Sequence, residues 1–88
     1  MNIMKSTPLK LICDTSNPIE NINLFVNTVK NYDYDIDVMS GRYIVDAKSI
    51  MGLFSLDLAS DLTLRILSDD CGDLLDELGK LGFLPNVD

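Results

Sequence analysis

The spacing of apolar residues predicts an α+β open-faced β-sandwich, with elements in the order β-α-β-β-α-β-α. Short stretches around Ile36 and Leu64 alternate apolar and polar residues, as half-buried strands do. Two longer stretches repeat apolar residues every three or four positions, as amphipathic helices do. A four-stranded antiparallel sheet with three helices on one face buries both patterns, so this is the fold we expect.

The first two elements follow from residues 9–29. Leu9, Leu11 and Cys13 alternate with Lys10 and Ile12, which predicts a short strand. Next, "SNPIE" predicts a helix start with a capping-box arrangement, in which Asn17 is the N-cap, Pro18 the first helical residue and Glu20 the third. The apolar face of this helix consists of Ile22, Phe25, Val26 and Val29.

The remaining elements follow without a linker. Residues 35–45 predict a β-hairpin that turns at Ser40-Gly41, because glycine accepts the positive φ of such turns. A short helix is expected from about Ile50 to Ser55, and the alternation in "DLTLRIL" predicts a fourth strand. Gly82 is placed to end a last helix, whose apolar residues are Leu74, Leu75, Leu78 and Leu81.

Length and charge limit the classes of function. With 88 residues, the chain is expected to form a single domain over residues 1–88. The net charge is −7 and the seven basic residues are scattered, so a nucleic-acid-binding surface is not expected. The N-terminus lacks the pattern of a signal peptide, and no run approaches the roughly 18 apolar residues of a membrane span. We therefore expect a cytoplasmic protein that does not bind membranes.

The chain contains no histidine, which excludes a histidine base, a phosphohistidine and an imidazole metal ligand. Cys13 and Cys71 match no zinc or redox motif. We interpret them as reduced thiols, the alternative being a single disulfide in an oxidising compartment. The aspartates show no EF-hand spacing, and no carboxylate pair is arranged for acid–base chemistry. No catalytic residue, metal site, cofactor or enzymatic activity is predicted.

The segment "AKSIMGLFSL" resembles the region around the regulatory serine of the HPr family, the small phosphocarriers of the bacterial phosphotransferase system. "LFVN" at 24–27 and "YDYDIDV" are similar to the family's first helix and the approach to its second strand. The resemblance covers about residues 5–84 and implies the same open-faced sandwich.

The same alignment shows a departure from the family's phosphocarrier motif, which reads glycine, apolar residue, histidine, alanine, arginine, proline. The histidine position falls on Pro18 and the arginine position on Glu20. Proline offers no nucleophile, and a carboxylate repels phosphate. Thr15 and Ser16 lie nearby, but no neighbouring residue would activate either hydroxyl, and we interpret them as turn residues.

Ser49 has two compatible roles. Its position predicts the N-cap of the short helix, and the resemblance implies a regulatory phosphosite. Of the apolar residues that follow, we expect Leu53 and Leu56 to pack inward. The resemblance implies that Ile50, Met51 and Phe54 form a docking surface for a protein partner, together with Asn23 and Leu24 on the first helix. The alternative is that all five apolar residues of the short helix belong to the core.

Two functions remain open. The first is a non-catalytic, HPr-like regulatory domain that binds a component of the phosphotransferase or carbon-control system and is regulated at Ser49. The second is a structural module, such as a homodimer that hides the apolar helix and has no phosphotransferase role. Nothing in the sequence names the partner.

Overall fold

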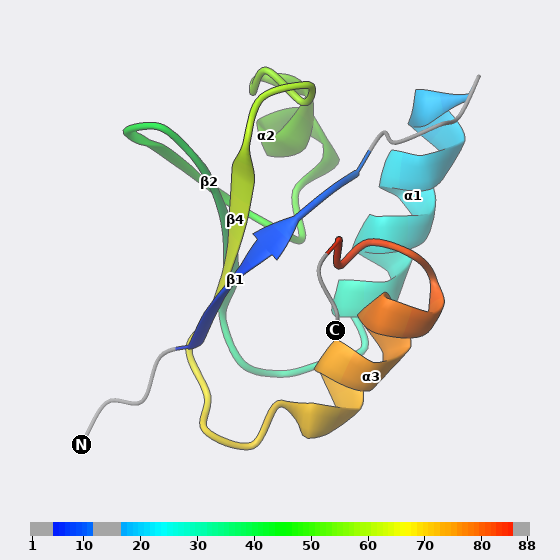
Figure 1. The fold of residues 1–88 in the computed structure, drawn as a ribbon, viewed down its shortest axis with the longest axis vertical. Helices are drawn as coiled ribbons and strands as arrows, with labels where there is room; N and C mark the ends of the chain where they lie inside the picture. The colour runs from blue at the N-terminus through cyan, green and yellow to red at the C-terminus, as the bar shows by residue number, and fades with distance from the viewer. Residues whose placement is uncertain (1–4, 12–16, 86–88) are drawn as a thin grey trace.

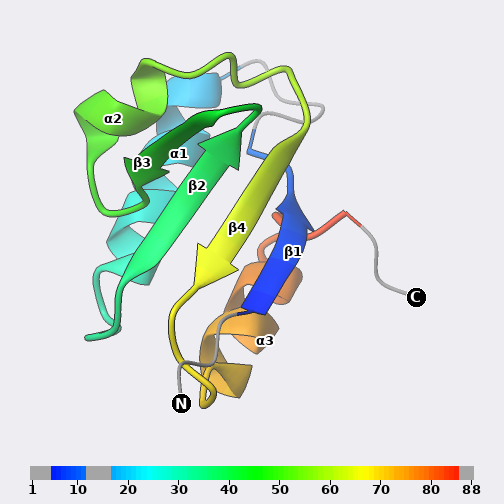
Figure 2. The ribbon, with the colours of Figure 1, turned by 90° about the vertical axis from the view of Figure 1, so that its left-hand side faces the viewer.

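The polypeptide forms one antiparallel sheet with its helices on one face, in a computed structural model that describes residues 5–11 and 17–85 (Figure 1). The strands pair in the order β1-β4-β2-β3, so β1 and β3 are the two edges of the sheet (Figure 2). The elements in chain order are β1 (Lys5–Leu9), α1 (Pro18–Val29), β2 (Ile36–Ser40), β3 (Tyr43–Asp46), α2 (Ile50–Phe54), β4 (Leu62–Ile66) and α3 (Gly72–Lys80). The predicted fold class and element order are confirmed.

The two central strands are held in register by burial of alternate residues. In β4, Leu62, Leu64 and Ile66 are buried beneath the helices, while Thr63 and Arg65 face the other side. On that open side Arg65 lies opposite Asp37 of β2, and its Nη2 donates to Asp37 Oδ2 at 2.7 Å. A slip of one residue would expose the apolar set, so the alternating pattern fixes the register.

The helices complete one hydrophobic core. All four apolar-face residues of α1 are buried, as predicted, and Leu74 and Leu78 of α3 are buried beside them. Gly82, at φ +88°, ends α3 and turns the chain so that the Phe83 N–H donates to the Leu78 carbonyl at 3.0 Å. The Phe83 ring then packs edge-to-face on Phe25, with 5.6 Å between ring centroids.

Four boundary predictions differ from the structure. The first strand occupies Lys5–Leu9 rather than residues 9–13; Leu11 is buried beyond its end, and Cys13 lies outside the described residues. Leu81 is exposed because α3 has already ended at Lys80. The hairpin turn is Gly41-Arg42, one residue later than predicted, with Gly41 at φ +59°. The short helix ends at Phe54, and Ser55 is its C-cap.

Candidate functional site

The hydroxyl of Ser49 caps α2. Its Oγ accepts a hydrogen bond from the Gly52 N–H at 3.1 Å, and its carbonyl accepts from the Leu53 N–H at 3.0 Å. Ser49 itself is half-buried. The predicted capping role is confirmed, whereas phosphorylation of this residue remains a prediction.

Gly52 allows α2 to lie very close to the sheet. A Cβ at this position would stand 3.3 Å from Ser49 Oγ and 3.3 Å from Val45 Cβ of β3, which is tighter than ordinary side-chain contacts. The backbone of α2 therefore rests directly on β3. The lack of a side chain at residue 52 brings the cap and the strand together.

Lys48 ties the start of α2 to the loop that follows α1. Its Nζ donates to the carbonyl oxygens of Tyr32 at 2.6 Å and Tyr34 at 3.0 Å, while its backbone N–H donates to Asp46 Oδ1 at 2.9 Å. Sequence reasoning did not assign a role to this lysine, because the two carbonyls come from residues 14 and 16 positions earlier. The ammonium group is thus engaged inside the protein rather than offered to solvent.

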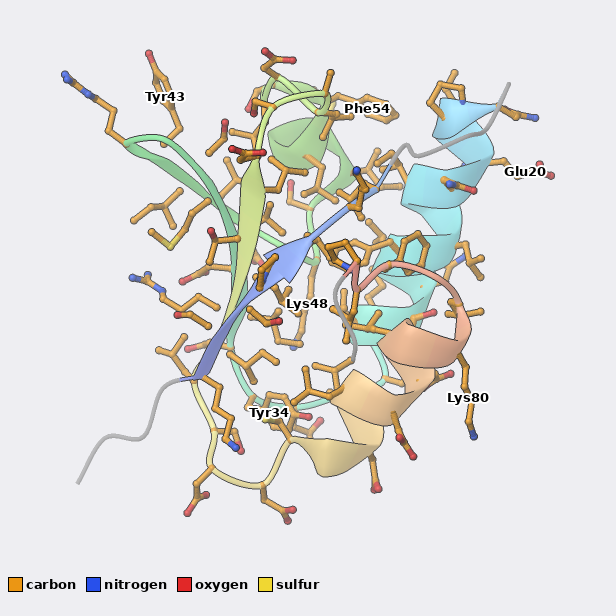
Figure 3. All side chains as sticks on the ribbon, in the orientation of Figure 1. Glu20, Tyr34, Tyr43, Lys48, Phe54 and Lys80 are labelled. Carbon is orange, nitrogen blue, oxygen red and sulfur yellow. The ribbon has the colours of Figure 1, made fainter. Side chains whose placement is uncertain are left out.

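The apolar residues of α2 divide between core and surface. Leu53 is buried and Leu56 is partly buried against the core. Ile50, Met51 and Phe54 are 38%, 83% and 44% exposed; we call these three residues the α2 patch. Figure 3 shows Phe54 on the side of α2 that faces α1. Its role as a docking surface remains a prediction.

The start of α1 is capped as predicted, but with altered capping-box chemistry. Asn17 Oδ1 accepts from the Glu20 N–H at 3.4 Å, and the Asn17 side-chain amide donates to Glu20 Oε1 at 3.3 Å. Pro18 occupies the first helical position and is exposed. Glu20 lies on the side of α1 away from Phe54 (Figure 3). Thr15 and Ser16 fall outside the described residues.

Other exposed residues of α1 border this region. Asn23 and Leu24 are both exposed, and α1 packs directly against α2. Ile19 is 61% exposed, although sequence reasoning did not select it. Ile19 stands three residues before Ile22, so helical spacing alone would group it with the apolar face, and only the structure shows that it is exposed. The structure thus adds Ile19 to the surface apolar residues near the start of α1.

A second polar contact joins the loop after α1 to α3. The Tyr32 hydroxyl donates to Glu77 Oε1 at 2.8 Å, and this hydrogen bond, with a smaller effect of burial, raises the pKa of Tyr32 to about 12. Burial also raises the pKa of Tyr34, whose hydroxyl is enclosed and finds no hydrogen-bond partner among the described residues. Both effects favour the neutral phenol.

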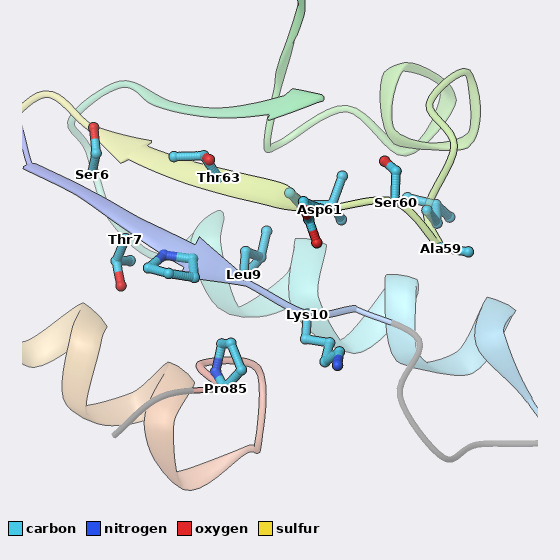
Figure 4. Close-up of a pocket in the computed structure, with 12 residues that line it drawn as sticks. Ser6, Thr7, Leu9, Lys10, Ala59, Ser60, Asp61, Thr63 and Pro85 are labelled. Carbon is cyan, nitrogen blue, oxygen red and sulfur yellow. The ribbon is translucent and has the colours of Figure 1, made fainter. Parts of the chain in front are cut away.

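A surface depression lies along the β1 edge, and none of the predicted site residues lines it. Ser6, Lys10, Asp61, Thr63 and Pro85 are among its lining residues (Figure 4). The lining contains hydroxyl groups together with the Lys10 ammonium and the Asp61 carboxylate. Over residues 5–11 and 17–85, no group of three or more metal-ligating side chains gathers, and no helix has the length and apolar character to cross a membrane.

Comparison with known proteins identifies the family. The family model described as "PTS HPr component phosphorylation site" matches residues 20–81. The structure is similar to a phosphocarrier protein HPr from Bacillus anthracis str. Ames, at 26% identity and a TM-score of 0.71, over 90% of this chain and 96% of that chain. It is also similar to HPr-C-His from Thermoanaerobacter tengcongensis, at 26% identity and a TM-score of 0.69, over 88% and 89% of the two chains. No curated protein matches.

Proposed function

This chain belongs to the PTS-HPr family of phosphocarriers, and from that premise we propose that it is a non-catalytic regulatory domain that binds a protein of the phosphotransferase or carbon-control system. It acts in the cytoplasm and does not carry phosphate on histidine. The observation that carries the proposal is that the family's fold is retained in a chain without histidine. The family consists of carriers rather than catalysts, so the loss of a phosphoryl acceptor leaves protein binding as the retained property.

The start of α1 supports the loss of the carrier role. Pro18, at the position matched to the family's histidine, has neither a nucleophilic atom nor a backbone N–H. Glu20, at the position matched to the arginine, bonds with Asn17 and adds negative charge where a phosphoryl group would need a cation. Both replacements favour a capped helix over phosphoryl transfer.

The α2 patch supports the binding role. Met51 exposes most of its flexible thioether side chain, and the Phe54 ring lies at the surface on the side of α2 next to α1. Methionine adapts to the shape of a partner, and aromatic rings supply much of the energy of protein interfaces. We include the exposed residues Asn23, Leu24 and Ile19 of α1, the helix that packs against α2, in the proposed binding surface.

Regulation at Ser49 forms part of the proposal. A phosphate at this position keeps an oxygen able to accept from the Gly52 N–H, so the cap survives modification. The added charge stands directly before Ile50 and changes the edge of the α2 patch. Lys48 is already held by two carbonyls, so the charge acts on the partner rather than on a nearby free ammonium.

Phosphoryl transfer from phosphoenolpyruvate tests the loss of the carrier role. The purified protein is incubated with phosphoenolpyruvate and the general phosphotransferase enzyme, and its intact mass is measured. The mass is expected to stay unchanged, while HPr from Bacillus anthracis, as the control, gains one phosphoryl group. A gain of one phosphoryl group by this chain contradicts the proposal.

Binding to purified phosphotransferase and carbon-control proteins tests the regulatory role. We expect one of them to bind the wild type, and Met51→Asp to weaken that binding at least tenfold. Leu67→Asp, a matched change of an exposed apolar residue that follows β4, should leave the affinity unchanged. If Met51→Asp and Leu67→Asp lose affinity equally, the α2 patch is not the binding surface. If none of these proteins binds the wild type, in either its unphosphorylated or its phosphorylated form, the regulatory role is contradicted.

Treatment with the family's serine kinase and ATP tests the regulatory site. The wild type is expected to gain one phosphoryl group and Ser49→Ala none, as read by intact mass. Persistence of the modification in Ser49→Ala means that another residue is the acceptor.

A further inference from the structure

The β3 strand offers an open sheet edge. It pairs with β2 on one side and ends the sheet on the other (Figure 2). Its two large edge residues, Tyr43 and Ile44, are 68% and 50% exposed. The opposite edge is better protected, because β1 contains Pro8 and is flanked by Lys10, two features that discourage strand pairing.

The hydrogen-bonding pattern shows which backbone groups point outward. Ala47 donates to the Ile36 carbonyl at 2.9 Å, which places residues 43, 45 and 47 on the side bonded to β2. In an antiparallel ladder the intervening residues direct their N–H and C=O groups the other way. For β3 these residues are Ile44 and Asp46. The Asp46 carbonyl already accepts a hydrogen bond from the Ser49 N–H. The N–H and C=O groups of Ile44 and the N–H of Asp46 therefore remain to pair with a further strand.

We propose that this edge binds a second copy of the chain, with two β3 strands antiparallel and Ile44 opposite its symmetry mate. The paired Ile44 residues exchange two backbone hydrogen bonds across the two-fold axis. Charge complementarity selects this register. Arg42, in the turn just before β3, and Asp46, at the end of β3, are each two residues from Ile44, so this register brings Arg42 of either copy next to Asp46 of the other.

The side chains agree with the same register. Ile44 lies opposite Met39 and therefore on the open face of the sheet, where the two isoleucines of a dimer meet. Tyr43 of one copy lies opposite Val45 of the other, on the helix side. There a shallow depression, lined in part by Val45 and Leu56, is available to the ring. A shift of two residues would instead set Ile44 against Asp46.

The dimer is expected to be weak, because the paired strands have only four residues each. A small interface leaves little binding free energy after the entropic cost of association, so the dimer should form only at high protein concentration. The proposal is separate from the function proposed above, since its contacts are made by β3 and not by the α2 patch. The proposed β3 dimer is also distinct from the homodimer considered in the sequence analysis, whose interface would be the apolar residues of α2.

Sedimentation velocity with charge-exchange variants tests the register. From about 10 µM to about 1 mM in low salt, the wild type should shift from monomer toward dimer, and more salt should weaken the shift. Arg42→Asp alone and Asp46→Arg alone place like charges opposite each other twice, so each should stay monomeric. An equimolar mixture of the two variants restores both opposite-charge pairs and should form a heterodimer.

Two further variants distinguish a dimer formed through β3 from one formed through the α2 patch. Ile44→Pro removes an outward N–H at an edge position where proline is tolerated, so it should abolish the dimer while retaining the far-ultraviolet circular dichroism of the fold. Met51→Asp alters only the α2 patch and should leave the dimer intact. A wild type that remains monomeric throughout overturns the proposal. A dimer that persists in Arg42→Asp also overturns it. If the dimer is lost in Met51→Asp but retained in Arg42→Asp, the interface is the α2 patch and not β3.

Discussion

The ammonium group of Lys48 lies 2.6 Å from the carbonyl oxygen of Tyr32, and it bonds the carbonyl of Tyr34 as well. These contacts join the residue before the α2 cap to the loop that leaves α1. The two helices that carry the proposed docking surface are therefore held together by one side chain in addition to their apolar contacts. The Lys48 ammonium thus supplies the hydrogen-bond donor for the Tyr32 and Tyr34 carbonyls, two backbone acceptors in this loop.

Lys48→Met is expected to lower the free energy of unfolding by about 1–3 kcal/mol, because it removes two hydrogen bonds to a charged donor. Urea unfolding followed by circular dichroism measures this change. Lys5→Met, an exposed substitution in β1, is the matched control and should change stability by less than about 0.5 kcal/mol. Similar losses in the two variants would mean that the Lys48 contacts do not stabilise the fold.

Glycine-to-alanine substitutions in two helices should have opposite effects. Gly52→Ala places a methyl group 3.3 Å from Val45 Cβ, and we expect a net loss of about 1–2 kcal/mol despite the better helix propensity of alanine. In α3 the nearest atom to a Cβ at Gly79 is 4.0 Å away, so Gly79→Ala should gain up to about 1 kcal/mol. Thermal unfolding compares the pair, and a stabilised Gly52→Ala variant would show that α2 can move off β3.

Removing the α2 cap should reduce stability without changing the fold. Ser49→Ala leaves the Gly52 N–H without its acceptor and is expected to cost about 1 kcal/mol. Ser49→Asp keeps an acceptor at the cap and should cost less. The order of the two urea midpoints checks the geometry, and it is independent of whether Ser49 is phosphorylated. A reversed order would contradict the capping geometry.

Alkaline pH should weaken the fold through Tyr32. Its pKa is raised from 10.0 to about 12 in the folded protein, chiefly by the hydrogen bond to Glu77. The folded state thus holds this proton more tightly than the unfolded chain. The resulting stabilisation is complete below pH 10 and is lost as the pH rises toward 12. Thermal unfolding midpoints across this range should fall more steeply for the wild type than for Tyr32→Phe.

Glu77→Gln provides the second arm of this test. Replacing the carboxylate removes the charge that opposes ionisation of Tyr32, so the alkaline loss of stability should also become less steep. Parallel curves for all three proteins would show that the Tyr32–Glu77 contact does not contribute to the pH dependence.

Local patterns predicted most elements because they depend on nearby residues. Alternation around Leu64 identified β4, and the stripe that includes Phe25 identified α1. The same reasoning misplaced the first strand. Leu11 is buried beyond the end of β1, where its carbonyl accepts from the Asn21 side chain at 3.0 Å. Alternating apolar residues indicate that a segment is partly buried. The pattern alone does not distinguish a residue buried in a paired strand from one buried against a neighbouring helix.

The amino-acid sequence alone determined the order of elements, the caps at Asn17 and Ser49, and the absence of any histidine, since each depends on composition or on residues a few positions apart. Tertiary structure decided which apolar residues of α2 reach the surface, what Lys48 bonds, and which sheet edge lies open. Those features arise from contacts between segments distant in the chain, and local spacing does not encode such contacts.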